Sequence, residues 1–185
     1  AVIPTSATKA YVALYERNHL AVLDLADAGS QLPAHTIDLG PYVSPSDSDG
    51  LVETIGGYYS APRKRLYVVL GSVDRTQNAL SGGYACTGTR AKVVAFDVST
   101  DLPVALGDGG TGYAELAGYA QLSSDSIAYD PSGDRLLIAS RGCVDNGVIA
   151  RRQIESVSLA SGAVTTLATI NDQPAPRAIY RIDSN

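Results

Sequence analysis

The sequence predicts an all-β protein built from repeated antiparallel strands, and three observations support this prediction. A pair of strands recurs three times with the same spacing. In each pair the first strand opens with an apolar residue, and a basic residue six positions later opens the second strand. The chain is rich in turn formers, with 18 Gly and 9 Pro, and it contains 11 Tyr, which favours strands. Such repeats indicate a circular or solenoid architecture. The pairs are Ile3 with Lys9, Tyr59 with Arg65, and Tyr129 with Arg135.

The first copy of the repeat is expected over residues 1–39, with strands that read AVIPT, KAYVALYE, HLAVLDLA and PAHTIDL. In the third of these strands Leu23 and Leu25 alternate with Val22 and Asp24, which is the period-2 pattern of a packed strand. We expect Leu23 to be buried and Val22 to lie on the opposite face.

The second copy is expected over residues 51–122 and the third over residues 123–170. The second contains the longest insertion, SVDRTQNALSGGYACTGTR, after its second strand. The third contains a tight hairpin, DPSGDR, in which Pro131 presets φ and Gly133 can supply a positive φ. Residues 174–185 resemble the first strand of a further copy.

Two strand motifs recur along the copies, TKAYVAL before HLAVLDLADAG in the first and RLYVVL before VVAFDVSTD in the second. They resemble the YVTN-type β-propeller repeat of bacterial and archaeal surface-layer and secreted proteins, in which a Y-V-x-N strand precedes a V-x-V-I-D strand. The family's Asn is absent from every copy, and the third copy departs furthest. The resemblance implies a β-propeller. The matching residues are Tyr11, Val12, Ala13, Val22, Leu23 and Asp24, then Tyr67, Val68, Val93, Phe96 and Asp97.

The number of copies predicts an incomplete ring. A propeller needs about four to eight blades, and open sheet edges are a liability. The chain supplies about three four-stranded blades and one strand of a fourth, so we expect it to form part of a six- to eight-bladed ring. The expected partners are the remaining blades, on another chain, on a removed segment or on a symmetry mate.

Cys86 and Cys143 are the only cysteines, and neither lies in a CxxC pair. In the repeat register both fall in the loop between the second and third strands of adjacent copies. A structural disulfide is therefore expected, with two free buried thiols or a reactive cysteine as the alternatives. A disulfide predicts an extracytoplasmic location.

Charge and hydropathy argue against two classes of partner. The net charge of −5 disfavours nucleic acid, because phosphate binding needs clustered Lys and Arg. No run approaches the ~20 apolar residues that span a bilayer.

Loops after the second strand of each blade, and loops that enter the first strand, are expected to share one face, where propeller ligands bind. Core packing is expected for strand tyrosines such as Tyr11, whereas Tyr58, Tyr84, Tyr113 and Tyr119 are freer to serve a surface. The polar residues expected on the loop face are Glu16, Arg17, Asn18, His19, Asp74, Arg75, Asp125, Asp145 and Asn146.

The segment SDSDG offers carboxylates at alternate positions before a glycine. Asp47, Asp49 and Glu53 could hold calcium, although Glu53 is too near for the distal ligand of a calcium loop. A solvated acidic loop is the alternative, and no other cofactor is expected.

The main functional prediction is a non-catalytic scaffold that binds a protein or glycan ligand on the loop face. One alternative is a metal-dependent hydrolase of the lactonase type, with Glu16, Asp125 and Asn146 converging from separate copies. Another is a structural component of a surface layer or fibre. His19 and His35 are expected at opposite ends of a blade, which argues against a His-based metal centre or catalytic triad.

Overall fold

The computed structural model describes five stretches of the chain, residues 1–26, 33–77, 84–106, 112–119 and 126–170. Within them the strands form four antiparallel sheets, and residues Gly40–Tyr42 form a short 3-10 turn, η1. The predicted all-β class is therefore confirmed. None of the described helical residues forms a helix long and apolar enough to cross a bilayer. The expected strand at 174–185 lies outside the described residues.

Each of the three larger sheets is built from its own stretch of chain. The first sheet has the order β1 (Val2–Pro4), β2 (Lys9–Ala13), β3 (His19–Asp24), β4 (His35–Asp38). The middle sheet has the order β5 (Thr54–Ser60), β6 (Arg65–Leu70), β7 (Lys92–Asp97), β8 (Pro103–Val104), and β9 (Tyr113–Glu115) also pairs with β7. The third sheet has the order β10 (Ile127–Asp130), β11 (Arg135–Ala139), β14 (Gln153–Ser158), β15 (Val164–Thr169).

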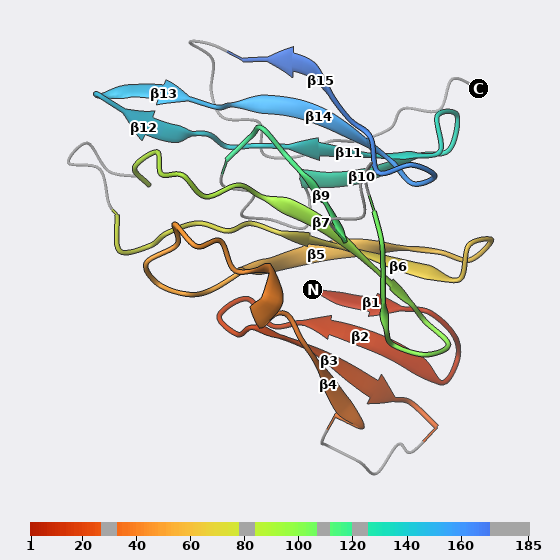
Figure 1. The fold of residues 1–185 in the computed structure, drawn as a ribbon. Helices are drawn as coiled ribbons and strands as arrows, with labels where there is room; N and C mark the ends of the chain where they lie inside the picture. Colours follow the sequence, from red (N-terminus) through yellow and green to blue (C-terminus); the bar gives the residue numbers. More distant parts are fainter. Residues whose placement is uncertain (27–32, 78–83, 107–111, 120–125, 171–185) are drawn as a thin grey trace.

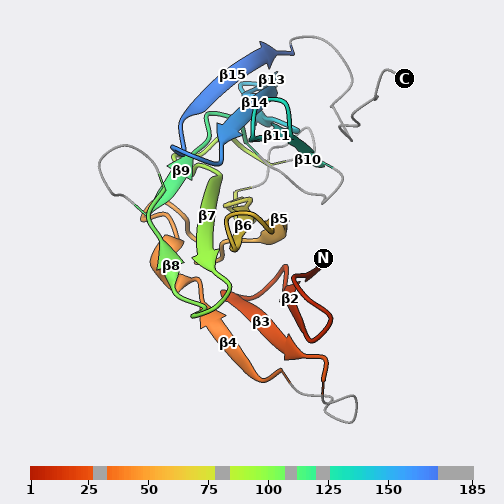
Figure 2. The ribbon, with the colours of Figure 1, turned by 90° about the vertical axis from the view of Figure 1, so that its right-hand side faces the viewer.

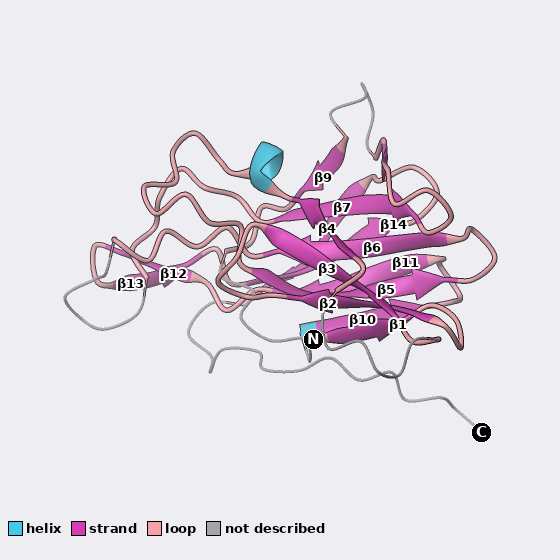
Figure 3. Ribbon diagram, turned by 90° about the horizontal axis from the view of Figure 1, so that it is seen from below, coloured by secondary structure: helices cyan, strands magenta, loops and turns pink. Residues whose placement is uncertain are grey.

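The fourth sheet is a small hairpin of β12 (Cys143–Asp145) and β13 (Val148–Ala150), inserted between β11 and β14. Figure 3 shows this hairpin extending beyond the larger sheets on one side of the molecule.

The first two strands of each larger sheet form a hairpin, but the register is not identical in all three. Tyr59 pairs with Leu66, and Tyr129 pairs in the equivalent way with the residue seven positions on. Ile3 pairs instead with Tyr11, eight positions on. The turn of the first sheet is thus one residue longer, which the spacing of the basic residues did not reveal.

The sequence predicted a positive φ at Gly133 in the turn before β11. In the structure Asp134 has the positive φ instead (45°). Lys64 (φ 51) has the equivalent position before β6. Aspartate tolerates this left-handed conformation better than most residues. At this position the Asp134 carboxylate also forms an ion pair with Arg63 and accepts a hydrogen bond from Tyr129.

The three larger sheets are stacked face to face, with the middle sheet between the other two (Figures 1 and 2). Along β6, Leu66 and Val68 pack into the core cluster shared with the first sheet. The alternate residues, Tyr67 and Val69, pack into the cluster shared with the third sheet. This burial of both faces explains why β6 and β7 read as continuous apolar runs rather than as alternating ones.

The first sheet packs only one of its faces against the middle sheet. Val22 (3% exposed) belongs to the core shared with the middle sheet, whereas Leu23 is half-buried on the other face and Leu25 is 44% exposed. The expectation that Leu23 faces the core is therefore wrong. The alternation was read correctly, but the pattern does not say which face meets the neighbouring sheet.

The tyrosines divide between core and surface differently from the prediction. Tyr11 and Tyr67 are fully buried, as expected for strand residues. Tyr119 was expected on a surface, yet it is also fully buried. Tyr58 stacks on Tyr129 with ring centroids 4.3 Å apart, and this contact joins the middle and third sheets.

The two cysteines form the predicted disulfide. Cys86 precedes β7 and Cys143 opens β12, and their Cα atoms are 5.0 Å apart. Around it, the Cys86 amide donates to the Val144 carbonyl at 3.0 Å and the Val144 amide donates to the Tyr84 carbonyl at 2.8 Å. The disulfide therefore ties the middle sheet's long insertion to the projecting hairpin.

Replacing Phe96 by Ala should destabilise the protein by about 3–5 kcal/mol, because the ring is 1% exposed in the core between the first and middle sheets. Leu23→Ala should cost about 1 kcal/mol, because its side chain is only half-buried. Urea denaturation of both variants measures the difference. Equal costs would show that the faces of the first sheet are assigned wrongly.

Cys86→Ser should lower stability by about 4 kcal/mol, because the disulfide closes a long loop that the unfolded chain otherwise samples freely. Thermal unfolding under oxidising conditions gives the measurement. A double variant, Cys86→Ser with Cys143→Ser, should behave like the single variant. An unchanged melting temperature in both would show that the cross-link constrains nothing.

Candidate functional site

Three loops meet at one end of the first and middle sheets. The Asn18 side chain joins two of them, donating from Nδ2 to the Gly50 carbonyl at 2.7 Å and accepting at Oδ1 from the Val52 amide at 3.1 Å. The third loop follows β6, and its Ser72 amide donates to the Val52 carbonyl at 3.1 Å. Asn18, a predicted face residue, thus fixes the segment that enters β5.

Three aspartates on these loops form what we call the carboxylate cluster. Asp47 and Asp49 come from the segment before β5, and Asp74 comes from the loop after β6. One carboxylate oxygen of each lies within 4.8 Å of the others. Asp74 is almost fully buried, whereas the other two are half-buried and reach the surface.

Local hydrogen bonds set the positions of these carboxylates. The Leu51 amide donates to Asp49 Oδ1 at 2.9 Å, and the Thr76 amide donates to Asp74 Oδ1 at 3.0 Å. A hydrogen bond donated by a backbone amide to the carboxylate of the aspartate two residues earlier is typical of turns. The Ser48 amide also donates to Asp74 Oδ2 at 3.2 Å, which links the two loops.

The aspartates differ in their preference for a proton. Burial, and then the charge of Asp49, raise the pKa of Asp47 to about 6. Burial acts in the same direction on Asp74, but hydrogen bonds from the Thr76 hydroxyl and the Ser48 amide outweigh it and hold the pKa of Asp74 below its usual value. At a pH near 6, Asp47 is therefore partly protonated while Asp74 stays ionised.

Glu53 lies beside the cluster with its side chain fully buried. Its Oε2 accepts from the Val73 amide at 2.8 Å, and its Oε1 is 3.5 Å from Arg75 Nε. Among the described residues, neither Glu53 Oε1 nor Asp47 Oδ2 has a hydrogen-bond donor, although both atoms are buried. Glu53 also has a positive φ of 40°. Buried orphan oxygens and backbone strain are both concentrated at functional sites.

Arg75 is the main positive charge at this site. Its Nη1 donates to Glu16 Oε1 at 2.9 Å, and its backbone amide donates to Asp49 Oδ2 at 2.9 Å. One guanidinium thus faces Glu16, Asp49 and Glu53. The carboxylates outnumber it, and oxygen ligands of this kind suit Ca²⁺, Mg²⁺ or Mn²⁺. The residues present therefore fit a divalent cation.

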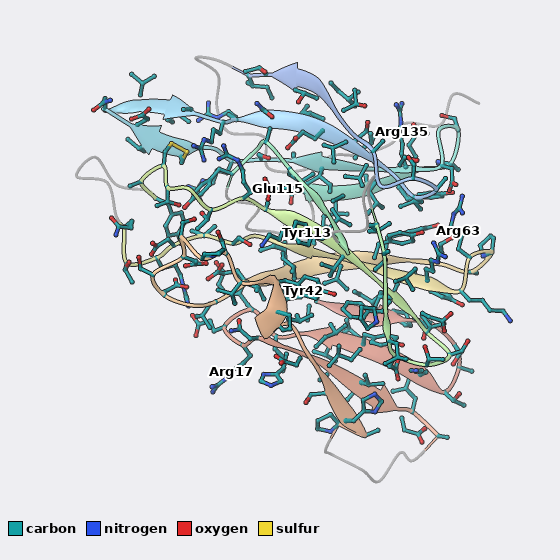
Figure 4. The ribbon with its side chains drawn as sticks, viewed as in Figure 1. Arg17, Tyr42, Arg63, Tyr113, Glu115 and Arg135 are labelled. Atoms are coloured by element: carbon teal, nitrogen blue, oxygen red, sulfur yellow. A yellow bond between two sulfur atoms is a disulfide. The ribbon has the colours of Figure 1, made fainter. Side chains whose placement is uncertain are left out.

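Other predicted face residues lie elsewhere. Asp145 ends β12 and Asn146 follows it in the turn before β13; both are exposed, and Asn146 Nδ2 donates to Asp145 Oδ1 at 3.1 Å. Arg17 is exposed and points away from the sheets (Figure 4), and His19 opens β3 at the surface. Asp125 lies outside the described residues. The expected convergence of Glu16, Asp125 and Asn146 is therefore not shown.

The sequence reasoning missed a second polar cluster between the first and middle sheets. Asp101, in the turn after β7, accepts from Lys9 Nζ at 2.8 Å and from the Tyr11 hydroxyl, and it lies 3.0 Å from His35 Nε2. A pocket of about 300 Å³ adjoins Lys9 and His35. Since Asp101 is 92 residues from Lys9, no local motif could have indicated the contact.

Comparison with known proteins gives similarity in structure only. No family model matches the chain, and no curated protein matches it. A structure from Bacteroides uniformis, named "putative 6-phosphogluconolactonase", is 16% identical, with 86% of this chain and 36% of that one covered and a TM-score of 0.46. A second, of the same name and from Bacteroides fragilis, is 18% identical, with 89% and 36% covered and a TM-score of 0.49.

These matches correct the main functional prediction. Both are named as enzymes, which contradicts a non-catalytic scaffold for a protein or glycan ligand and agrees better with the hydrolase alternative. The chain spans 36% of the length of each. Any activity of the whole protein is therefore a proposal, argued below from the residues of this chain.

In the presence of a chelator, stability should fall as the pH rises from 4.5 to 8. Burial raises the pKa of Glu53 to about 8, from the ordinary 4.5. Between these values the folded protein holds a proton that the unfolded chain releases, so the free energy of unfolding decreases by up to about 1.4 kcal/mol per pH unit. Below pH 4.5 both forms are protonated and this loss is absent.

Urea denaturation across this pH range measures the slope. Glu53→Gln should flatten it, whereas Glu16→Gln, at an exposed position, should leave it unchanged. An equal slope in wild type and Glu53→Gln would show that Glu53 is ionised in the folded protein.

Proposed function

We propose that the chain forms part of a β-propeller of six to eight blades, with blades at about residues 1–39, 51–122 and 123–170. Three stacked sheets support this, together with the unburied face of the first sheet, on which Val2 is 65% exposed. The remaining blades would cover that face, from another chain, a further segment or a symmetry mate. The YVTN-type resemblance is part of the same proposal.

We also propose that the assembled protein is a metal-dependent hydrolase that cleaves a lactone or a similar ester, outside the cytoplasm. The observation that carries this is the carboxylate cluster, in which Asp47 Oδ2 is buried without a hydrogen-bond donor among the described residues, as is Glu53 Oε1 beside the cluster. Without a cation, Asp47 Oδ2 loses hydration and gains no hydrogen-bond donor, and Glu53 Oε1 has only the 3.5 Å contact with Arg75 Nε. The disulfide supports the extracytoplasmic location.

The residues of the cluster have distinct roles in this proposal. Asp47, Asp49 and Asp74 hold the ion, with calcium the expected metal. A bound cation supplies a Lewis acid for a carbonyl oxygen. Arg75, whose side chain is 27% exposed, lies at the solvent edge of the cluster and orients the substrate by donating a hydrogen bond. Glu53 supports Arg75 from the buried side.

A structural role for the same ion, in a surface layer or fibre, is the second candidate. It is favoured by the hydrogen bonds through which Asp49 and Asp74 already join separate loops. An ion there would stabilise the loops and catalyse nothing. Binding and hydrolysis therefore have to be measured separately.

Asp47→Asn should abolish tight binding of Ca²⁺ and Mn²⁺, measured by isothermal titration calorimetry, and reduce cation-dependent lactone hydrolysis at least about 100-fold, measured in a pH-stat with δ-gluconolactone. The chelated variant should be at least as stable as chelated wild type, because repulsion between Asp47 and Asp49 is removed. Asp145→Asn removes the same charge from the exposed end of β12 and should change neither result.

Cation binding without hydrolysis of any lactone or ester by the full protein would establish the structural role. An unchanged cation affinity in Asp47→Asn would overturn both candidates.

A further inference from the structure

Two arginines, Arg90 and Arg151, lie close in sequence and pairing to the disulfide. Arg90 Nη1 is buried and has no hydrogen-bond acceptor among the described residues. Arg151 Nη1 donates to the Thr87 carbonyl at 2.8 Å. In the described part of the chain, neither arginine forms an ion pair with a carboxylate, although Arg63, Arg75 and Arg135 all do.

The two arginines lie on contacting segments, because the Thr87 carbonyl that accepts from Arg151 Nη1 is three residues before Arg90. Burial, and then the charge of Arg90, lower the pKa of Arg151. Placing two like charges together at a partly buried position costs free energy unless an anion is bound between them. The cost is notable in a chain whose net charge is −5, because acidic partners are plentiful.

Hydroxyl groups line the same place. Thr87 Oγ1 lies 2.7 Å from Thr89 Oγ1 and 3.2 Å from the Tyr119 hydroxyl. Tyr119 is fully buried, and its amide donates to the Arg151 carbonyl at 3.2 Å. Guanidinium and hydroxyl donors together are the groups that bind phosphate and carboxylate oxygens.

The backbone that carries these donors is held firmly. Cys86 directly precedes Thr87, and Cys143 pairs across the hairpin with Ala150, next to Arg151. The disulfide therefore fixes both donor-bearing segments. Arg151 also has a positive φ of 53°, a strained conformation for a non-glycine residue.

The insertion also touches the loop of the carboxylate cluster. A Cβ placed on Gly88 would lie 3.0 Å from Ser46 Oγ, and Ser46 precedes Asp47. The arginine pair and the carboxylate cluster are thus on adjoining loops of one face.

We propose that Arg90 and Arg151 form an oxyanion-binding site for a ligand that carries a phosphate or carboxylate group. Two planar guanidinium groups can each donate a pair of hydrogen bonds to such a group. Thr87, which is partly exposed, has a hydroxyl on the same segment, and the buried Thr89 and Tyr119 hydroxyls hold it in position. The site goes beyond the proposed hydrolase and does not depend on it, since it uses none of the residues of the carboxylate cluster.

Calorimetric titration of the full protein with inorganic phosphate, at low ionic strength and with a chelator, tests the proposal. We expect measurable binding in wild type, and an affinity at least about tenfold lower in Arg90→Gln and in Arg151→Gln. Arg17→Gln removes the same charge from an exposed position and should change the affinity less than about twofold. Separate titrations with methyl phosphate and with acetate show which oxyanion the site prefers.

Circular dichroism establishes that each variant is folded. If a Gln variant does not fold, Arg90→Lys decides, because it keeps the charge and loses the planar fork, and it should bind phosphate at least about threefold more weakly. Reduction of the disulfide should weaken binding as well. No binding of any anion to wild type, or equal losses in Arg151→Gln and Arg17→Gln, would overturn the proposal.

Discussion

The structure depends on the burial of the middle sheet on both faces. β6 and β7 carry apolar side chains in both directions, so each face needs another sheet against it. The first and third sheets supply these partners, and their own outer faces are correspondingly less buried. Stacked sheets place loops of the same class next to one another. The functional candidates therefore lie where loops of neighbouring sheets meet, and not within any one repeat.

The loop contacts show how polar groups are accommodated at the junction between the first and middle sheets. Asn18 satisfies backbone groups of the segment that enters β5, and the carbonyl of Glu53 accepts from the Gly71 amide at 3.0 Å. These backbone groups are paired, whereas Asp47 Oδ2 and Glu53 Oε1 have no hydrogen-bond donor among the described residues. A loop selected only for stability would satisfy the side chains as well. The orphan oxygens of Asp47 and Glu53 are the feature that folding alone does not explain.

Period-2 patterns and repeat spacing predicted the strands and the all-β class, and the repeat register predicted the cysteine pair. They failed where the answer depends on a neighbouring sheet. Alternation separates Val22 from Leu23 but does not say which of them meets the middle sheet, and Tyr119 is buried by contacts that its own segment does not encode. The sequence motif indicated only part of the carboxylate cluster. Asp47 and Asp49 lie in one motif, whereas Asp74 joins them from 25 residues or more along the chain. Arg90 and Arg151 have no motif at all.

The distribution of charge on the loop face argues for ligands more strongly than either site does alone. Arg75 serves Glu16, Asp49 and Glu53, whereas Arg90 and Arg151 have no carboxylate partner in the described stretches of the chain. If carboxylates of the cluster paired with the arginines of the adjoining loop, the repulsion within each group of like charges would be relieved, since opposite charges favour each other's ionised forms. Selection for stability would favour that pairing. The two proposals account for its absence, because each supplies the like charges with a counter-charge from outside the chain, a cation at the carboxylates and an oxyanion at the arginines.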